Sequence, residues 1–187
     1  MANGFNVAEQ GHPILILPPA SITGGATSQA FSMKHAEHVS IIIAFGTMAS
    51  PPVNPTAIIV KQCTDANGSN ATALASFRYY YQSTAGAGYD TLDGYAQCLS
   101  NSPNLPPNYT TAVTGITSFP TSVADLIYVI EIDAAELEII ADTVGSSTEY
   151  PYLELVITSA ATATYATAIA VLSGLRYASK LNATATT

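Results

Sequence analysis

Short apolar runs separated by Pro, Gly and Asn recur along the whole chain. Runs of this kind, with side chains alternating between two faces and turn residues at their ends, predict β-strands rather than amphipathic helices. We predict strands within residues 13–17, 38–46, 56–64, 73–83, 112–119, 126–132, 150–159 and 168–179. Because no amphipathic helix separates them, they predict an all-β fold: an antiparallel β-sandwich, with a jelly roll as the preferred topology and one long irregular loop.

Some of these strands carry further expectations. The first is expected to stop at Pro18, because proline cannot donate to a sheet ladder. The strands at 56–64 and 73–83 are joined by a connection that contains Asn67 and Gly68, and this pair predicts the clearest hairpin of the chain. The last strand has the Ala and Leu content of a short helix, but its alternating apolar residues favour a strand.

The stretch LIYVIEIDAAELEII, residues 126–140, changes its periodicity halfway. Its first half predicts a buried strand. Its second half predicts one helical turn, in which Asp133 accepts the backbone N–H of Glu136 while the Glu136 side chain reaches back. We expect this corner to lead the chain from one sheet to the other. The carboxylates at 131, 133, 136 and 138 are expected only to cap the turn and to meet water, since the loop lacks the glycine and the alternating ligands of an EF-hand calcium site.

Charged residues make up 10% of the chain, whereas a soluble domain usually carries about a quarter. Membrane insertion, disorder and burial against other protein are the three explanations to weigh. Disordered chains are poor in Ile, Val and Tyr, in which this chain is rich. The longest uncharged run late in the chain, residues 155–175, contains so much Ser, Thr and Ala that it predicts two strands joined by a loop rather than a membrane span. Burial against other protein is therefore the favoured explanation.

With 187 residues the chain can bury a core of its own. We predict a single β-sandwich domain over residues 1–187, with residues 1–30 and 180–187 as terminal extensions. The net charge of −8, with five basic residues scattered singly, argues against binding to nucleic acid. The N-terminus lacks the pattern of a signal peptide, so a cytosolic protein in which Cys63 and Cys98 are reduced thiols is expected.

Few residues offer reactive chemistry. His35, Glu37 and His38 are possible zinc ligands, but a third ligand at a recognisable spacing is missing. A pair of histidines at the start of a strand, with one ring facing solvent, is the preferred interpretation. The chain contains no motif of a serine or cysteine nucleophile, and its glycine-rich stretches lack the setting of a phosphate-binding loop. We therefore predict no catalytic residue, no cofactor and no metal, and an enzyme is only the third alternative.

The long irregular loop spans residues 83–110. Loops of this length in a compact domain are usually functional. Its aromatic and leucine residues fall on no single strand face, and aromatic residues often anchor interfaces. We predict that the main intermolecular contacts are made by Tyr89, Tyr95, Leu99, Leu105 and Tyr109. The alternative is that the loop folds back and covers an open end of its own sandwich.

Six segments between residues 35 and 179 follow one another in an order that carries information about the class of protein. They are HVSIIIAFG, AIIVKQCTDANGSNATALASFRYYY, DTLDG, IYVIEIDAAEL, YLELVITSA and IAVLSGLRYAS. This order resembles that of small accessory virion proteins of tailed bacteriophages, the capsid decoration or cement class. The resemblance implies a β-rich fold, no enzymatic activity, and a place on the virion after assembly in the host cytoplasm.

The same resemblance implies the partners of the chain. They are the major capsid protein or other virion proteins, together with further copies of the chain in a homo-oligomer, for which a trimer is preferred. Neck, head-fibre and tail accessory proteins share such patterns and remain alternatives. A carbohydrate- or host-surface-binding module is the alternative from a different class, because a tyrosine-rich loop on a β-sandwich is also a lectin-like feature.

Overall fold

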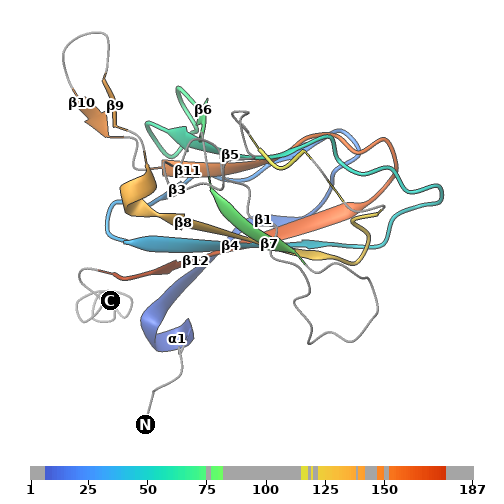
Figure 1. Cartoon of the computed structure of the whole chain (residues 1–187), viewed down its shortest axis with the longest axis horizontal. Helices are drawn as coiled ribbons and strands as arrows, with labels where there is room; N and C mark the ends of the chain where they lie inside the picture. Colours follow the sequence, from blue (N-terminus) through green and yellow to red (C-terminus); the bar gives the residue numbers. More distant parts are fainter. Residues whose placement is uncertain are drawn as a thin grey trace, which may run out of the picture.

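The computed structural model describes residues 7–74, 77–81, 115–117, 119, 122–137, 139–141, 147–149 and 152–175. In these parts the chain is built almost entirely from antiparallel strands, which form two large sheets and one small one. The two large sheets lie one above the other as the layers of a sandwich (Figure 1). The predicted all-β class and the antiparallel sandwich are confirmed.

The first sheet contains five strands in the order β1-β12-β4-β8-β7. Every neighbouring pair in it is antiparallel. Its strands are β1 (Gly11–Ser21), β12 (Tyr165–Ser173), β4 (His38–Phe45), β8 (Ile127–Asp133) and β7 (Arg78–Tyr81).

The second sheet has the order β2-β11-β5-β6, with β3 also paired to β11. Its strands are β2 (Ala26–Thr27), β11 (Tyr152–Ile157), β5 (Ile58–Cys63), β6 (Thr72–Ala73) and β3 (Phe31–Ser32). The small sheet is a hairpin of β9 (Ile139–Ala141) and β10 (Ser147–Glu149), which stands away from the sandwich (Figure 1).

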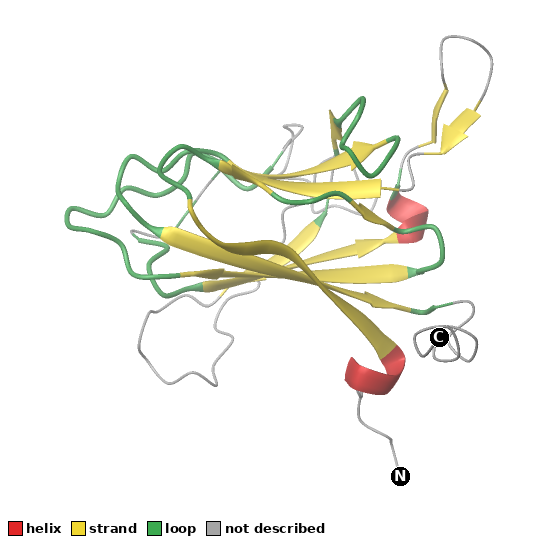
Figure 2. Cartoon of the chain, turned by 180° about the vertical axis from the view of Figure 1, so that it is seen from behind, coloured by secondary structure: helices red, strands yellow, loops and turns green. Residues whose placement is uncertain are grey.

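Two short helical turns complete the described elements. The helix α1 (Val7–Gln10) lies at the start of β1 (Figure 2). The 3₁₀ turn η1 (Ala134–Glu136) directly follows β8, where the sequence predicted one helical turn. After η1 and the β9–β10 hairpin the chain enters β11 of the second sheet, so the corner does lead from one sheet to the other, as predicted.

Strict alternation along the strands builds the core between the two sheets. In β4 the inward residues are Val39, Ile41, Ile43 and Phe45, and all of them are buried. Their counterparts in the second sheet include Ile58, Val60, Leu153, Leu155 and Ile157. Because side chains of a strand alternate between the faces of the sheet, the residues between these positions point outward.

The first strand is longer than predicted, because β1 does not stop at Pro18 but continues to Ser21. It is an edge strand of the first sheet, and its register with β12 shifts on either side of Leu17. Edge positions and bulges tolerate proline, since an outward N–H needs no partner strand. Ile16 and Ile22 are buried in the core. Residues 11–30, expected as part of a terminal extension, therefore belong to the sandwich.

The predicted hairpin of residues 56–64 and 73–83 is correct only next to its turn. Strand β5 pairs with β6 through two residues, and β7 then pairs with β8 in the other sheet. Leu74 and Phe77 lie between β6 and β7 in the sequence, and both side chains are buried. Burying them requires the chain to cross from one layer to the other, and this tertiary packing outweighs the local hairpin signal.

Two other predictions have different outcomes. Within the predicted strand 112–119, only Ile116 pairs among the described residues, in an isolated bridge to Ile58. The run 155–175 forms the end of β11, a loop and β12, as predicted, and β12 is a strand rather than the alternative helix. No helix in the described part of the chain is long and apolar enough to span a membrane.

Candidate interaction surface

The outer face of the first sheet exposes a row of apolar side chains. The strand registers place Leu15 opposite Ile169, Ile169 opposite Ile42, and Ile42 opposite Val129. Residues directly opposite each other in antiparallel strands share one face of the sheet. The side chains are 53% exposed at Leu15, 40% at Ile169 and 37% at Ile42, so this row crosses the sheet in contact with solvent.

Two more large apolar residues extend this surface along the strands. Ile127, two residues from Val129, is 38% exposed, and Tyr165, four residues from Ile169, is 61% exposed. We call Leu15, Ile42, Ile127, Tyr165 and Ile169 the apolar row. They are five of the seven exposed large apolar residues in the described part of the chain. Contiguous exposed apolar surface of this kind is unusual on a monomer and marks interaction sites.

The sequence contains a signal for this surface. Ile41, Ile42 and Ile43 form an uninterrupted apolar run in β4, although only Ile41 and Ile43 point into the core. Continuous apolar runs are typical of strands that are covered on both faces, whereas a sheet with one solvated face alternates apolar and polar residues. The β4 sequence is therefore that of a strand whose outer face is also covered.

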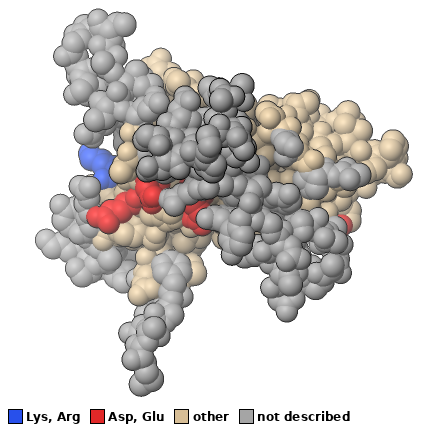
Figure 3. Space-filling view, viewed as in Figure 1, with Lys and Arg blue, Asp and Glu red and all other residues tan. Residues whose placement is uncertain are grey.

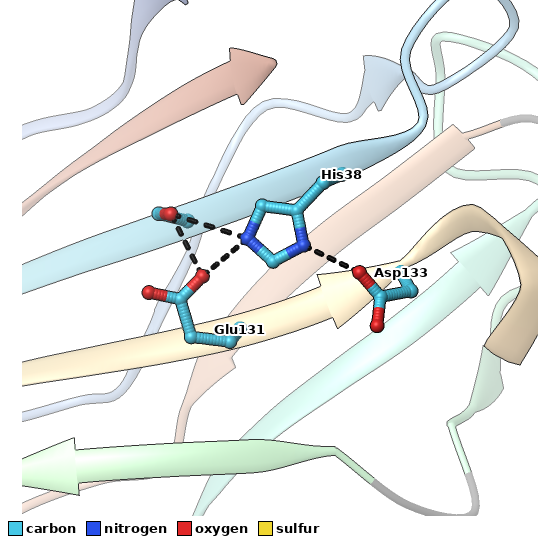
Figure 4. A network of polar contacts seen from close by, with 4 residues as sticks. His38, Glu131 and Asp133 are labelled. Atoms are coloured by element: carbon cyan, nitrogen blue, oxygen red, sulfur yellow. Dashed lines mark hydrogen bonds and ion pairs between the residues drawn. The ribbon is translucent and has the colours of Figure 1, made fainter. Parts of the chain in front are cut away.

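A network of polar side chains lies on the same face, next to the apolar row. Figure 4 shows its His38, Glu131 and Asp133. The His38 ring lies between two carboxylates, with Nδ1 2.7 Å from Asp133 Oδ1 and Nε2 2.5 Å from Glu131 Oε2. Ser40 donates its hydroxyl proton to Glu131 Oε2 over 2.8 Å. We call these four residues the polar network.

Strand register alone brings the polar network together. His38 and Ser40 are two residues apart on β4, and Asp133 and Glu131 are two residues apart on β8. The register sets His38 opposite Asp133 and Ser40 opposite Glu131, so all four side chains share one face. The ring donates to both carboxylates only when both of its nitrogens carry protons. In that form its positive charge offsets part of the acidic charge at this end of the sheet.

The polar network resembles a Ser-His-Asp arrangement but does not activate the serine. The Ser40 hydroxyl donates to Glu131 and lies 3.5 Å from His38 Nε2, which itself faces the same carboxylate. A nucleophilic serine needs the imidazole as the acceptor of its proton. Here Glu131 occupies that position, so the arrangement is an ion-pair network on an open sheet face. In the described part of the chain, no three His, Cys, Asp or Glu side chains are grouped to hold a metal ion.

The sequence predictions for these residues are partly corrected. His35 is exposed and His38 is partly buried, which matches the predicted histidine pair with one ring facing solvent. Glu131 and Asp133 were expected only to cap the corner and to meet water. The structure shows that both carboxylates also hold His38, because β4 and β8 are neighbours in the sheet. No local pattern could reveal this pairing, since Glu131 is 93 positions away from His38.

The predicted interface residues Tyr89, Tyr95, Leu99, Leu105 and Tyr109 lie outside the described residues, as does Cys98. Their role therefore stays a prediction. Cys63 is a free, buried thiol at the end of β5, which is the strand-end position that the sequence predicted.

The outer face of the second sheet differs from that of the first. Its β5 and β11 place Lys61 opposite Glu154, and their charged atoms are 3.7 Å apart. Although it is on the outer face, Glu154 is buried, and a Cβ on Gly68 would lie 2.6 Å from its carboxylate. The turn around Gly68 therefore covers this part of the sheet. Figure 3 shows how sparse charge is in the molecule: a few acidic side chains gather in one region, and most of the described surface in this view is uncharged.

Two residues near the turn around Gly68 have shifted pKa values. Burial, reinforced by the charge of Glu154, raises the pKa of the Cys63 thiol to about 11. Hydrogen bonds from Ser69 and from the backbone of Asn67 lower the pKa of Asp65, whose carboxylate accepts both N–H groups and so closes the turn. The thiol at this site is therefore protonated at neutral pH and poorly reactive.

Comparison with known proteins assigns no relative to the chain. No family model, no curated protein and no solved structure matches it. What the fold and the surface support is a class of protein: an all-β sandwich with an exposed apolar sheet face and an ion-pair network beside it.

Proposed function

We propose that the chain is a non-enzymatic structural protein that associates with other protein through the outer face of its first sheet. The observation that carries this proposal is the apolar row, which exposes five large apolar residues on one face. The chain has few charges with which to keep such a face soluble, since only 10% of its residues are charged. Burial of the face against protein gives the low charge content a physical reason.

The arrangement of the polar network favours a structural role over catalysis. Its serine donates to a carboxylate and its histidine lies between two carboxylates, so no side chain of the network is prepared to attack a substrate. Ion pairs of this kind at the rim of an interface contribute to specificity more than to affinity. The network therefore fits the polar border of an apolar contact surface.

We propose the tailed-bacteriophage virion as the setting, in the role of a capsid decoration or cement protein. The order of segments such as IYVIEIDAAEL and IAVLSGLRYAS supports this setting through the resemblance described above. It implies the major capsid protein, or another virion protein, as partner. A neck, head-fibre or tail position is the alternative within the same setting.

We further infer that the sandwich is a jelly roll. The inference is supported by the nested pairing of strands: β1 with β12, β2 and β3 with β11, β4 with β8, and β5 with β6. The first strand thus pairs with the last, and each pair lies inside the previous one. A long antiparallel hairpin wrapped across two sheets produces this order, and jelly rolls are common in virus capsid domains.

Mass measurement of the purified chain, alone and after mixing with phage shells stripped of accessory proteins, tests the function. The proposal expects self-association, co-sedimentation with the shells at saturating stoichiometry, and loss of self-association when surface residues of the apolar row are made charged. A soluble monomer that ignores the shells and binds a sugar saturably on a glycan array would overturn it in favour of the lectin-like alternative.

A further inference from the structure

We propose that the apolar row is covered by the same row of a second copy of the chain, related by a two-fold axis. This proposal rests on the self-association included in the proposed function and names the partner of the exposed face. It follows from three observations: the edges of the first sheet are poorly suited to strand pairing, the described part of the chain has no other apolar patch, and the carboxylates described on the face already contact His38.

The edges of the first sheet are poor places for a second copy to add. Edge-to-edge pairing needs free backbone N–H groups along a regular strand. Strand β1 carries Pro13, Pro18 and Pro19, which have no N–H, and its register is interrupted on both sides of Leu17. At the opposite edge, β7 has only four residues. Two such sheets therefore associate more readily by their faces than by extending one another.

The rest of the described surface offers no second apolar patch, which favours a contact between the apolar rows of the two copies. Outside the apolar row, the exposed large apolar residues of the described chain are Val7 and Val53, which lie far apart in the sequence. A head-to-tail contact would need a second, different apolar patch for the row to meet. When the row meets its own copy, each patch provides the complement of the other, which is an isologous contact.

Charge permits this contact even though the chain carries a net charge of −8. The carboxylates that the structure describes on this face are Glu131 and Asp133, and both already contact His38. On β7, the Cα partner of Glu131 is Arg78, a basic residue. Because both carboxylates already have a partner within their own copy, two copies meet there with less repulsion than the net charge of the whole chain would suggest.

The arrangement of the face sets the direction of the axis. Along the strands, the polar network lies at one end, Ile42 and Ile169 in the middle, and Tyr165 at the other end. An axis that lies in the contact plane and crosses the strands near Ile42 lays Leu15, Ile169 and Ile42 on their own counterparts, and on β8 it sets Glu131 near the partner's Ile127. It also brings the polar network of each copy toward the partner's Tyr165, whose hydroxyl can donate to a carboxylate. An axis parallel to the strands would instead set one network against the other.

A charged substitution on the axis tests the contact, because every substitution occurs twice there. We expect the native chain to form an even-numbered oligomer at micromolar concentration: a dimer, or a hexamer when three-fold contacts are also made. In Ile42→Lys the two lysines face each other, so the mass should fall by half. Val53→Lys is the matched control, since Val53 is 43% exposed but lies outside the row, and its mass should stay unchanged.

A second measurement covers the case in which Ile42→Lys fails to fold. In a Cys98→Ser background, Ile42→Cys and Ile169→Cys place a thiol near the axis, and mild oxidation should link two copies through a disulfide at one or both positions. Val53→Cys should stay unlinked. A native monomer or trimer, an unchanged mass in folded Ile42→Lys, or no cross-link at either position overturns the two-fold contact. A trimer that binds the shells would leave the proposed function standing without the two-fold contact, whereas a monomer that ignores the shells would end both proposals.

Discussion

The outer faces of the two sheets differ in how far their outward side chains are covered from solvent. On the second sheet, the outward side chains of β5 and β11 are covered by the chain itself: Cys63 and Glu154 are buried there. On the first sheet, the outward side chains of β4 and β12 include Ile42 and Ile169, which are apolar and exposed. The turn around Gly68 covers part of one face, and the other face keeps Ile42 and Ile169 exposed.

This difference teaches how to recognise an interface in a β-sandwich. Alternation tells which residues of a strand enter the core, but it does not tell what happens on the other face. An apolar residue on the outer face needs a cover, from a loop of the same chain or from another molecule. Where the chain supplies no such cover in its described part, as over Ile42, the exposed apolar residue is the reason for proposing a contact with a partner.

The largest expected effect separates the two faces of a single strand. Ile41 points into the core and Ile42 points outward from the next position of β4. Ile41→Ala should lower the free energy of unfolding by about 2–5 kcal/mol, because it leaves a cavity in the core. Ile42→Ala should cost about 1 kcal/mol or less in the dissociated chain.

Urea unfolding at several protein concentrations measures both variants and separates folding from association. Ile42→Ala should also reduce the dependence of stability on protein concentration, because a partner stabilises only the folded chain. Equal losses in the two variants at low concentration would mean that the outer face is as well packed as the core. The contrast between the faces would then be wrong.

The next effect tests how closely the chain packs on the second sheet. A Cβ on Gly115 would lie 2.7 Å from the Ile58 carbonyl oxygen and 2.9 Å from Ile59 Cγ1. Gly115→Ala should therefore destabilise the fold by about 1–3 kcal/mol through overpacking. Gly24→Ala is the control, since nothing lies within 4 Å of its Cβ position. Thermal unfolding compares the two, and an unchanged transition in Gly115→Ala would show that this segment is loosely attached.

Much of the fold could be predicted from the sequence, because its strands follow from local patterns of apolar residues and turn residues. The apolar runs in β4, β11 and β12 end next to Gly, Pro or Ser, that of β8 lies between Asp125 and Ala134, and the structure places strands in all of them. The prolines of β1 misled the prediction, since proline stops a central strand but is compatible with an edge. The hairpin after β5 was overestimated, because the burial of Leu74 and Phe77 draws the chain into the other sheet.

The candidate surface was harder to predict, because it depends on the order of strands in the sheet. His38 meets Glu131 and Asp133 only because β4 and β8 are neighbours, and nothing in the local sequence of either strand specifies the other. Predicting the apolar row requires the order of four strands at once, since its residues lie in β1, β4, β8 and β12. The run Ile41–Ile43 was nevertheless a usable signal, since it lacks the polar residue that a solvated face requires.

A third prediction uses pH to probe the covered face. The folded chain holds the Cys63 proton up to a pKa of about 11, whereas an unfolded cysteine titrates near about 8.5. Between these values the folded state binds more protons, so the stabilisation present below about pH 8.5 is lost as pH rises toward 11. The stability of the native chain should fall more steeply with pH than that of Cys63→Ala, by at most about 1.4 kcal/mol per pH unit.

Denaturant unfolding between about pH 7.5 and about pH 10.5, the range in which the two states bind different numbers of protons, measures the two slopes. Tyrosines and lysines titrate in both proteins, and Cys98 is present in both, so the difference between the slopes reports Cys63. Parallel slopes would mean that water reaches the thiol and that this face is less covered than the structure shows.

The smallest effect compares the ion pairs of the two faces. On the open face, the side chains of His38, Glu131 and Asp133 are 29%, 22% and 44% exposed, so the network is partly solvated. A double-mutant cycle of His38→Ala and Glu131→Ala should give a coupling of about 0.2–1 kcal/mol, as for exposed ion pairs. On the covered face, the same cycle for Lys61 and Glu154 involves a carboxylate that is only 10% exposed.

The two coupling energies should differ more clearly in their dependence on salt than in their magnitude. Raising the ionic strength from about 0.1 M to about 1 M shortens the screening length from about 10 Å to about 3 Å, which weakens exposed pairs more than covered ones. We expect the His38–Glu131 coupling to lose most of its value and the Lys61–Glu154 coupling to keep most of its own. The same loss in both cycles would show that solvent reaches the two faces equally. If instead the His38–Glu131 coupling resists salt only at protein concentrations where the chain associates, the second copy shields the network, as the two-fold contact requires.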